Sequence, residues 1–166
     1  MNAIPVLTIE DVATLDGVLG NFLKKTESEL TIVIDRGGNV ISQCGDIDVM
    51  DVTVIAALAA GSFAATRELA RRIGEAEFNA LYHQGNGNHM FMNSVDDETI
   101  MITVFNSRTT VGLVRFYSAT TAQNVAAVLK TLRSSAHGFS FDAKDISAAP
   151  VFVDQSSKPA APVPAK

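Results

Sequence analysis

The chain has 166 residues, of which 47% are hydrophobic and 19% charged. This composition excludes a largely disordered chain, and the length fits one domain. A net charge of -5 argues against a broad nucleic-acid-binding surface. The single cysteine, Cys44, excludes an intramolecular disulfide and a cysteine-based zinc site.

The N-terminus lacks the features of a targeting segment. Residues Met1 to Leu7 include no basic side chain, and Glu10 and Asp11 follow soon after. The longest weakly polar run, Val52 to Thr66, is shorter than the ~20 residues that span a bilayer. We therefore expect a cytoplasmic protein that does not insert into a membrane.

The chain is expected to begin with a helix and a hairpin. Thr8 is the predicted N-cap of an amphipathic helix whose apolar residues recur at helical spacing up to Leu23. The ranges Leu30–Asp35 and Asn39–Gln43 predict two strands, because the glycines of the Arg36–Gly38 segment can adopt the positive φ of a tight turn.

A long helix is predicted over Val52–Ile73. Asp48 or Asp51 is its expected N-cap, and Gly74 is expected to end it in a left-handed conformation. Six of its residues fall on one stripe, which we expect to face the sheet. These are Ile55, Leu58, Ser62, Ala65, Leu69 and Ile73.

The opposite side of this helix is expected to contact a partner, because it carries small residues where a polar face is usual. These residues are Thr53, Ala57, Ala60, Gly61 and Ala64, flanked by Ala56 and Phe63. The alternative is a helix rich in alanine for propensity alone. Near its end, Arg67, Arg71 and Arg72 surround Glu68 and form either a solvated rim or a surface that attracts an acidic partner.

Two further strand pairs are predicted after this helix. The ranges Phe78–Gln84 and His89–Val95 form the first, joined by the turn Gly85–Asn88. The second consists of Thr99–Phe105 and Val111–Tyr117, which are rich in β-branched and apolar residues.

A closing helix is expected to start at Ser118, with an apolar face between Val125 and Leu132. From His137 onward the chain is rich in Ser, Ala and Pro, which predicts a domain over 1–136 and a disordered tail over 137–166. This order of elements lacks a strand-helix-strand rhythm and predicts an α+β fold with an antiparallel sheet.

Candidate chemical groups do not form a recognisable active site. His83, His89 and His137 lie on different predicted elements and lack the spacing of metal ligands. Gly85–Asn88 is not followed by the Lys and Ser/Thr of a phosphate-binding loop, and Asp96–Glu98 is expected to be a solvated loop. We therefore expect no metal, no cofactor and no catalysis by the chain itself.

Three segments occur in the order typical of one family: Ile34–Gly45 (IDRGGNVISQCG), Leu69–Phe78 (LARRIGEAEF) and Phe105–Arg115 (FNSRTTVGLVR). Together they resemble the Roadblock (dynein light chain Roadblock-type) family, and within it the MglB-like bacterial regulators of gliding motility. The resemblance covers roughly residues 8–135. It implies an antiparallel sheet with the long helix on one face and two terminal helices on the other.

The resemblance also implies a function. MglB-like proteins are homodimeric GTPase-activating proteins for MglA, a Ras-like small GTPase that lies across the paired long helices, and they supply no arginine finger. Arg36 and Arg108, in predicted loops, are accordingly not expected to be fingers. The implied GTPase-binding residues are Ala57, Ala60, Gly61, Ala64, Arg67, Glu68, Arg71 and Arg72, and the implied dimer residues are Ala56, Ala60, Phe63 and Tyr82.

Two alternatives stay open at this point. The first is a catalytically silent Roadblock scaffold that binds a GTPase or another Roadblock chain. The second concerns the tail, whose apolar groups around Phe139 and over Val151–Val153 resemble segments that order against a partner. A solubilising extension is the other interpretation of the tail.

Overall fold

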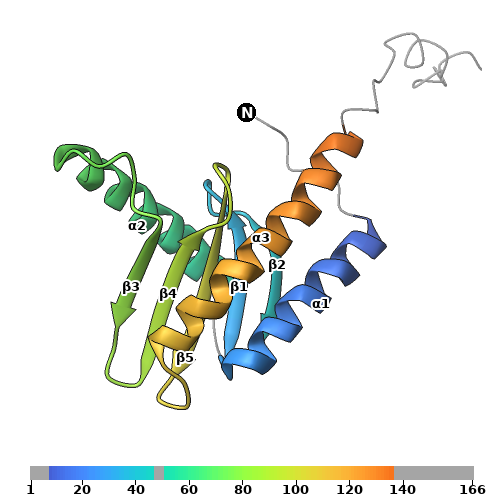
Figure 1. Cartoon of the computed structure of the whole chain (residues 1–166), viewed down its shortest axis with the longest axis horizontal. Coiled ribbons are helices and arrows are strands. Elements are labelled where there is room, and N and C mark those ends of the chain that lie inside the picture. Colours follow the sequence, from blue (N-terminus) through green and yellow to red (C-terminus); the bar gives the residue numbers. More distant parts are fainter. Residues whose placement is uncertain (1–7, 47–50, 137–166) are drawn as a thin grey trace, which may run out of the picture.

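The computed structural model describes residues 8–46 and 51–136. Its helices and strands are, in chain order, α1 (Ile9–Thr26), β1 (Leu30–Asp35), β2 (Val40–Gly45), α2 (Val52–Arg72), β3 (Ala80–Gln84), β4 (Asn88–Ser94), β5 (Thr99–Asn106) and α3 (Val111–Ala136). The strands form one antiparallel sheet in the order β2-β1-β5-β4-β3. Helices α1 and α3 lie on one face of the sheet and α2 on the other (Figure 1), as expected.

Helix α1 begins where the sequence predicts. The Thr8 side chain accepts a hydrogen bond from the Asp11 backbone N–H, and the Asp11 carboxylate accepts one from the Thr8 N–H, which completes a capping box. Leu15, Leu19 and Phe22 recur on one side of the helix and are buried in the core. This spacing holds α1 against the sheet.

The hairpin of β1 and β2 is closed by Asp35 and Gly38. One Asp35 carboxylate oxygen accepts hydrogen bonds from the backbone N–H groups of Gly37 and Asn39, both at 2.8 Å. Gly38 has a φ of +87°, and a Cβ on it would lie 2.9 Å from the Ala57 Cα. The turn therefore needs glycine for its backbone conformation and for its close approach to α2.

Helix α2 is capped as predicted at both ends. The Asp51 carboxylate accepts a hydrogen bond from the Val54 N–H at 3.2 Å, so Asp51 is the N-cap, and Asp48 lies outside the described residues. At the other end Gly74 has a φ of +87°. A left-handed residue at this position ends the helix.

The predicted strand Val111–Tyr117 is wrong, because these residues form the first turns of α3. Strand β5 already pairs with β1 on one side and β4 on the other, so no edge remains for a further partner. Ser118 is not the N-cap either. It is buried within the helix and donates a hydrogen bond to the Arg115 carbonyl, whereas Thr110 accepts one from the Leu113 N–H at the helix start.

Two apolar clusters lie on opposite sides of the sheet. The first joins α1 and α3 to inward-facing strand residues such as Val33 and Met101. The second joins α2 to the alternate residues of the same strands, including Ile32 and Ile102. Because every second side chain changes face, β1 and β5 contribute to both clusters and are buried almost throughout.

Candidate protein-interaction surface

Helix α2 faces the sheet with small residues and a single aromatic ring. Ala56, Ala60 and Phe63 are 0%, 5% and 1% exposed. Most residues of the predicted sheet-facing stripe point elsewhere, since Leu58 and Leu69 are 69% and 60% exposed, and only Ile55 packs against the buried cluster beneath the helix. The prediction that this stripe faces the sheet is therefore wrong by roughly a third of a helix turn.

The chemistry of the sheet explains this orientation. The strand residues beneath α2 are large, and they include Ile32, Ile34, Met92 and Ile102. Alanines on the helix let its backbone come close to these side chains, so that large strand residues fill the space that small helix residues leave. A hydrophobicity pattern weights large side chains most heavily and consequently selects the wrong side of the helix.

The buried side of α2 excludes three residues from the predicted dimer contact. Ala56, Ala60 and Phe63 lie in the core of the chain itself and are not accessible to a second molecule. This corrects their assignment to a dimer interface, and that of Ala60 to a GTPase contact. Tyr82, on the edge strand β3, is 37% exposed and remains accessible.

The remaining side of α2 is an exposed surface of small and large apolar residues. We call it the outer α2 surface and define it by Ala57, Leu58, Gly61, Ala64, Ala65, Leu69 and Ile73. A Cβ on Gly61 would meet no atom within 4 Å, so no internal contact requires glycine there. Glycine inside a helix costs about 1 kcal/mol relative to alanine. An approaching partner backbone gives a reason for retaining it.

Charged residues lie at the C-terminal end of this surface. Glu68 is exposed and pairs with Arg72, with 2.9 Å between Oε1 and Nε, and with Arg71, with 3.8 Å between Oε2 and Nη1. Arg67 is half-buried. Exposed pairs of this kind contribute little to folding stability, so Glu68, Arg71 and Arg72 can exchange them for contacts with a partner at modest cost.

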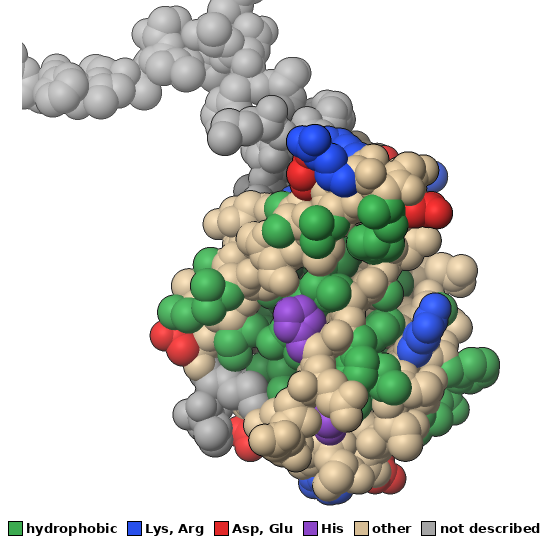
Figure 2. Space-filling view, turned by 90° about the vertical axis from the view of Figure 1, so that its left-hand side faces the viewer, with side chains coloured by type: hydrophobic (Ala, Val, Ile, Leu, Met, Phe, Trp, Pro, Cys, Tyr) green, Lys and Arg blue, Asp and Glu red, His purple; other side chains and the backbone are tan. Residues whose placement is uncertain are grey.

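The edge of the sheet next to α2 is also weakly charged. In Figure 2, which views the side on which β3 and the end of α2 lie, apolar side chains occupy the middle of the surface and charged ones lie mainly around it. At this edge, but on the sheet face that α1 and α3 cover, the Tyr82 ring stacks against Phe105 at 6.2 Å between centroids, and its hydroxyl lies 3.1 Å from His89 Nδ1. Tyr82 is thereby held in place at the edge strand.

Neither arginine in the predicted loops is arranged as a projecting finger. Arg36 Nε donates to the Asp97 carbonyl at 2.6 Å, its guanidinium pairs with Glu77 at 3.8 Å, and its Cζ lies 5.7 Å from the Phe63 ring centroid. Arg108 Nη2 pairs with Glu29 at 3.3 Å. The Arg36 side chain is therefore held within the domain, whereas Arg108, 63% exposed, makes only a surface pair.

The acidic loop has a structural contact that the sequence does not reveal. Asp96 pairs with Arg133 of α3, with 2.8 Å between Oδ2 and Nη1. Burial opposes ionisation of Asp96, but hydrogen bonds from the Glu98 N–H and from the Thr99 and Arg133 side chains outweigh it and lower the pKa of the carboxyl below its ordinary value. The ionised carboxylate anchors the β4–β5 loop to α3.

The other candidate groups do not converge. His83 and His89 lie on neighbouring strands, His137 lies outside the described residues, and in residues 8–46 and 51–136 no three His, Cys, Asp or Glu side chains are grouped to hold a metal. Burial, reinforced by the nearby Asp16 carboxylate, raises the pKa of the Cys44 thiol. A thiol of raised pKa is a poor nucleophile near neutral pH.

Helix α2 is long and apolar enough, by length and composition alone, to cross a membrane. Its Ala56, Ala60 and Phe63 nevertheless pack on the strands of the sheet, as in the core helix of an α+β domain. The outer α2 surface is therefore better explained by contact with a protein.

Comparisons with known proteins identify the family. Residues 14–105 match the Roadblock/LC7 domain. The solved structure of Myxococcus xanthus MglB has a TM-score of 0.71 and 28% sequence identity, over 76% of this chain and 96% of that one. The gliding protein MglB of Thermus thermophilus gives 0.71 and 25% over the same shares, and an MglB with a tetrameric arrangement gives 0.73 and 24% over 77% and 96%. A search of curated protein sequences gave no significant match. This chain belongs to the Roadblock/LC7 family, and its structure resembles that of MglB.

Proposed function

We propose that this chain is an MglB-like, homodimeric GTPase-activating protein for a Ras-like small GTPase of the MglA type, acting in the cytoplasm in cell polarity or motility. Its likeness to two MglB structures at 25% and 28% identity supports the proposal. The observation that carries it is the outer α2 surface, on which exposed leucines lie beside Ala57, Gly61 and Ala64.

The large residues of this surface favour a second copy of the chain as one partner. Leu58, Leu69 and Ile73 are each at least 60% exposed in the single chain. An isologous contact between two α2 helices would remove them from water, at about 1.5–3 kcal/mol for each fully buried side chain. The free edge of β3 and Leu81, which packs on the α2 side of the sheet, would extend such a contact, whereas the Tyr82 ring lies on the opposite face with Phe105.

The small residues favour the GTPase as the other partner. Ala57, Gly61 and Ala64 leave the α2 backbone open to close approach, and Glu68 with Arg71 and Arg72 supplies a polar margin. Because Arg36 is held by the domain and Arg108 is paired with Glu29, the proposed activation does not insert an arginine. Instead, the chain orders the catalytic loop of the GTPase, whose own groups then stabilise the transition state.

Single-turnover hydrolysis by an MglA-type GTPase from the same organism tests this function. The GTP-loaded GTPase is mixed with a saturating amount of this chain, and phosphate release is followed. We expect hydrolysis to accelerate well above the intrinsic rate. Binding without acceleration would support the silent scaffold instead, and the absence of both would contradict the proposal.

A further inference from the structure

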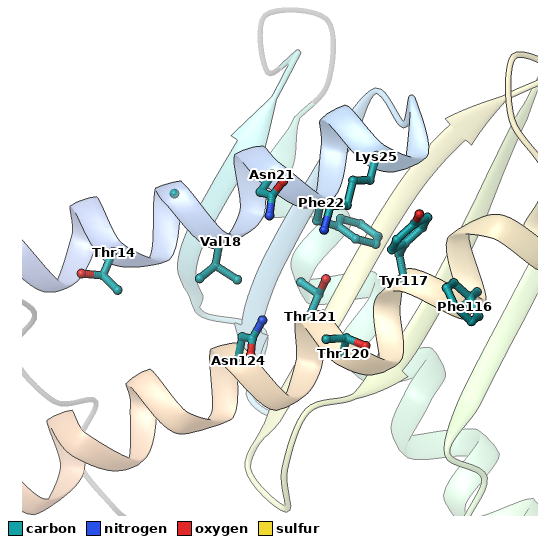
Figure 3. A pocket seen from close by; sticks show the side chains of 11 residues that line it. Thr14, Val18, Asn21, Phe22, Lys25, Phe116, Tyr117, Thr120, Thr121 and Asn124 are labelled. Atoms are coloured by element: carbon teal, nitrogen blue, oxygen red, sulfur yellow. The ribbon is translucent and has the colours of Figure 1, made fainter.

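A groove lies between α1 and α3, on the face of the sheet opposite α2 (Figure 3). Its volume is about 430 Å³. The walls include Gly17, Val18 and Asn21 of α1 and Phe116, Thr121 and Asn124 of α3. None of these residues has a place in the proposed GTPase contact.

The lining of the groove mixes polar and apolar side chains, which suits an extended stretch of chain whose backbone bonds to the polar groups while its apolar side chains pack on Val18, Phe22 and Phe116. The Asn21 and Asn124 amides extend into the space between the helices, where they can bond to a peptide backbone. At one end Phe116 is 72% exposed. Of the described residues that line the groove, only Lys25 is charged, and its Nζ lies 5.5 Å from the Tyr117 ring centroid.

Gly17 gives an independent reason to expect an occupant. It lies in the middle of α1 and lines the groove, and a Cβ on it would meet no atom within 4 Å. Alanine at this position would strengthen the helix by about 0.5–1 kcal/mol without a clash. A chain that runs close to the α1 backbone would be blocked by a side chain, which accounts for glycine here.

The length of the tail identifies the segment that can fill the groove. The middle of the groove at Thr121 lies fifteen residues of helix, or about 22 Å, before the end of α3 at Ala136. Phe141 follows Ala136 by five residues, which span at most about 17 Å. Val151 follows it by fifteen, which reach about 50 Å. Of the two apolar groups in the tail, only Val151–Val153 reaches the middle of the groove.

The charges of the tail and of the groove also favour this segment, and they indicate the direction in which it runs along α3. A tail that turns back from the end of α3 runs toward the start of that helix, where Tyr117 and Lys25 lie. Asp154 directly follows Val153 and would therefore approach the Lys25 ammonium group. The attachment of the tail to α3 also gives it a high effective concentration at the groove.

We propose that the groove between α1 and α3 binds Val151–Val153 of the same chain, with Phe152 beside Phe116 and Asp154 near Lys25. The contact uses the layer opposite the outer α2 surface and does not depend on a GTPase. The tail would thus bind to the two terminal helices α1 and α3 and leave α2 accessible to its partners.

Paramagnetic broadening in the full-length chain tests this contact. A nitroxide is placed on Gln155→Cys in a Cys44→Ala background, and the backbone amide signals are recorded. We expect the amides of Gly17–Lys25 and Phe116–Asn124 to lose more than half of their intensity, while those of β3 keep theirs. Uniform broadening, or none, would overturn the proposal.

Matched variants decide which segment is bound. Phe152→Ser should restore the groove signals, and Phe139→Ser in the same tail should not. Gly17→Leu fills the groove without an internal clash and should also restore the signals, with an unchanged or higher melting temperature. Persistent broadening in the Phe152→Ser or Gly17→Leu chain would overturn the proposal.

Isotope dilution distinguishes binding of the tail within one chain from binding of the tail to a second copy. The chain that is both spin-labelled and 15N-labelled is mixed with an excess of unlabelled, diamagnetic chain. Broadening that survives dilution supports binding within one chain. Broadening that disappears shows that the tail of a second copy occupies the groove, which contradicts the proposal.

Discussion

The two helical layers cover the sheet in opposite ways. Helices α1 and α3 turn large side chains inward, and Leu15, Phe22 and Leu129 are each at most 2% exposed. Helix α2 turns alanines inward and leaves Leu58 and Leu69 more than half exposed. The first layer completes a core, whereas the second completes a core and still presents apolar surface to the outside.

This difference assigns separate roles to the two sides of α2: the buried side stabilises the fold, and the exposed side is available for association. A helix needs one apolar side to hold its place on a sheet, and the alanines of α2 with Phe63 provide that side. The exposed leucines add little to the stability of the single chain, because they remain in water. They are accounted for if a partner covers them, as contiguous exposed apolar surface usually indicates.

The largest expected effect comes from the buried side of α2. Phe63→Ala should lower the free energy of unfolding by about 3–5 kcal/mol, because it leaves a cavity above the sheet. Urea denaturation measures this loss. Under conditions where the chain is monomeric, Leu69→Ala should change stability by less than about 1 kcal/mol. Equal losses for the two variants would contradict the observed orientation of α2.

Leu69→Asp should break the homodimer. A charge at this position would be buried without a partner in the contact between two α2 helices, which we expect to cost about 3 kcal/mol, or roughly a hundredfold in Kd. Light scattering coupled to gel filtration measures the change. Ile9→Asp is the control, because Ile9 is 90% exposed at the start of α1 on the other layer. The dimer contact is placed wrongly if Leu69→Asp leaves the mass unchanged.

Ala64→Arg should weaken GTPase binding without unfolding the chain. A long side chain on the exposed side of α2 blocks close approach, at about 2 kcal/mol, or roughly thirtyfold in Kd. Titration calorimetry gives the affinity. Ala119→Arg, an equal change at an exposed position of α3, should bind normally. Equal weakening by both variants would argue against the outer α2 surface.

Asp96→Asn should destabilise the domain in a pH-dependent way. The lowered pKa of Asp96 means that its ionised form stabilises the fold above the pKa of an unfolded carboxyl, about 4, and that this contribution is lost as the pH falls through the lower folded value. We expect a loss of about 1–2 kcal/mol at pH 7 that disappears toward strongly acidic pH. Denaturation at several pH values checks it, and a loss independent of pH would contradict it.

The smallest effect is expected for the loop arginines. Arg36→Ala and Arg108→Ala should retain most of the stimulated GTP hydrolysis at saturating chain concentration, since Arg36 is held within the domain and Arg108 is paired with Glu29. Loss of an arginine finger would instead lower turnover by ~10³–10⁵-fold. Single-turnover hydrolysis distinguishes these outcomes, and a collapse to the intrinsic rate in either variant would overturn the mechanism.

Local signals in the sequence predict much of the fold. The N-cap at Thr8, the turn with positive φ at Gly38 and the limits of α2 at Asp51 and Gly74 all depend on neighbouring residues, and the structure confirms them. These features are predictable because each is satisfied within a few residues of chain.

Two features escaped prediction because they depend on distant residues. The range Val111–Tyr117 has the composition of a strand, but both neighbours of β5 are already occupied, so it joins α3. The buried side of α2 is set by the large strand side chains beneath it. The recurrence of Ala56, Ala60 and Phe63 at helical spacing is the signal that could have indicated this side.

Hydrogen exchange with and without a GTPase tests most directly whether α2 is the layer that binds partners. The full-length chain is exchanged alone and with an MglA-type GTPase loaded with a non-hydrolysable GTP analogue. We expect the GTPase to protect amides around Ala57–Glu68 of α2 and to leave those of α1 and α3 unchanged. Protection confined to α1 and α3, with α2 unaffected, would contradict the account.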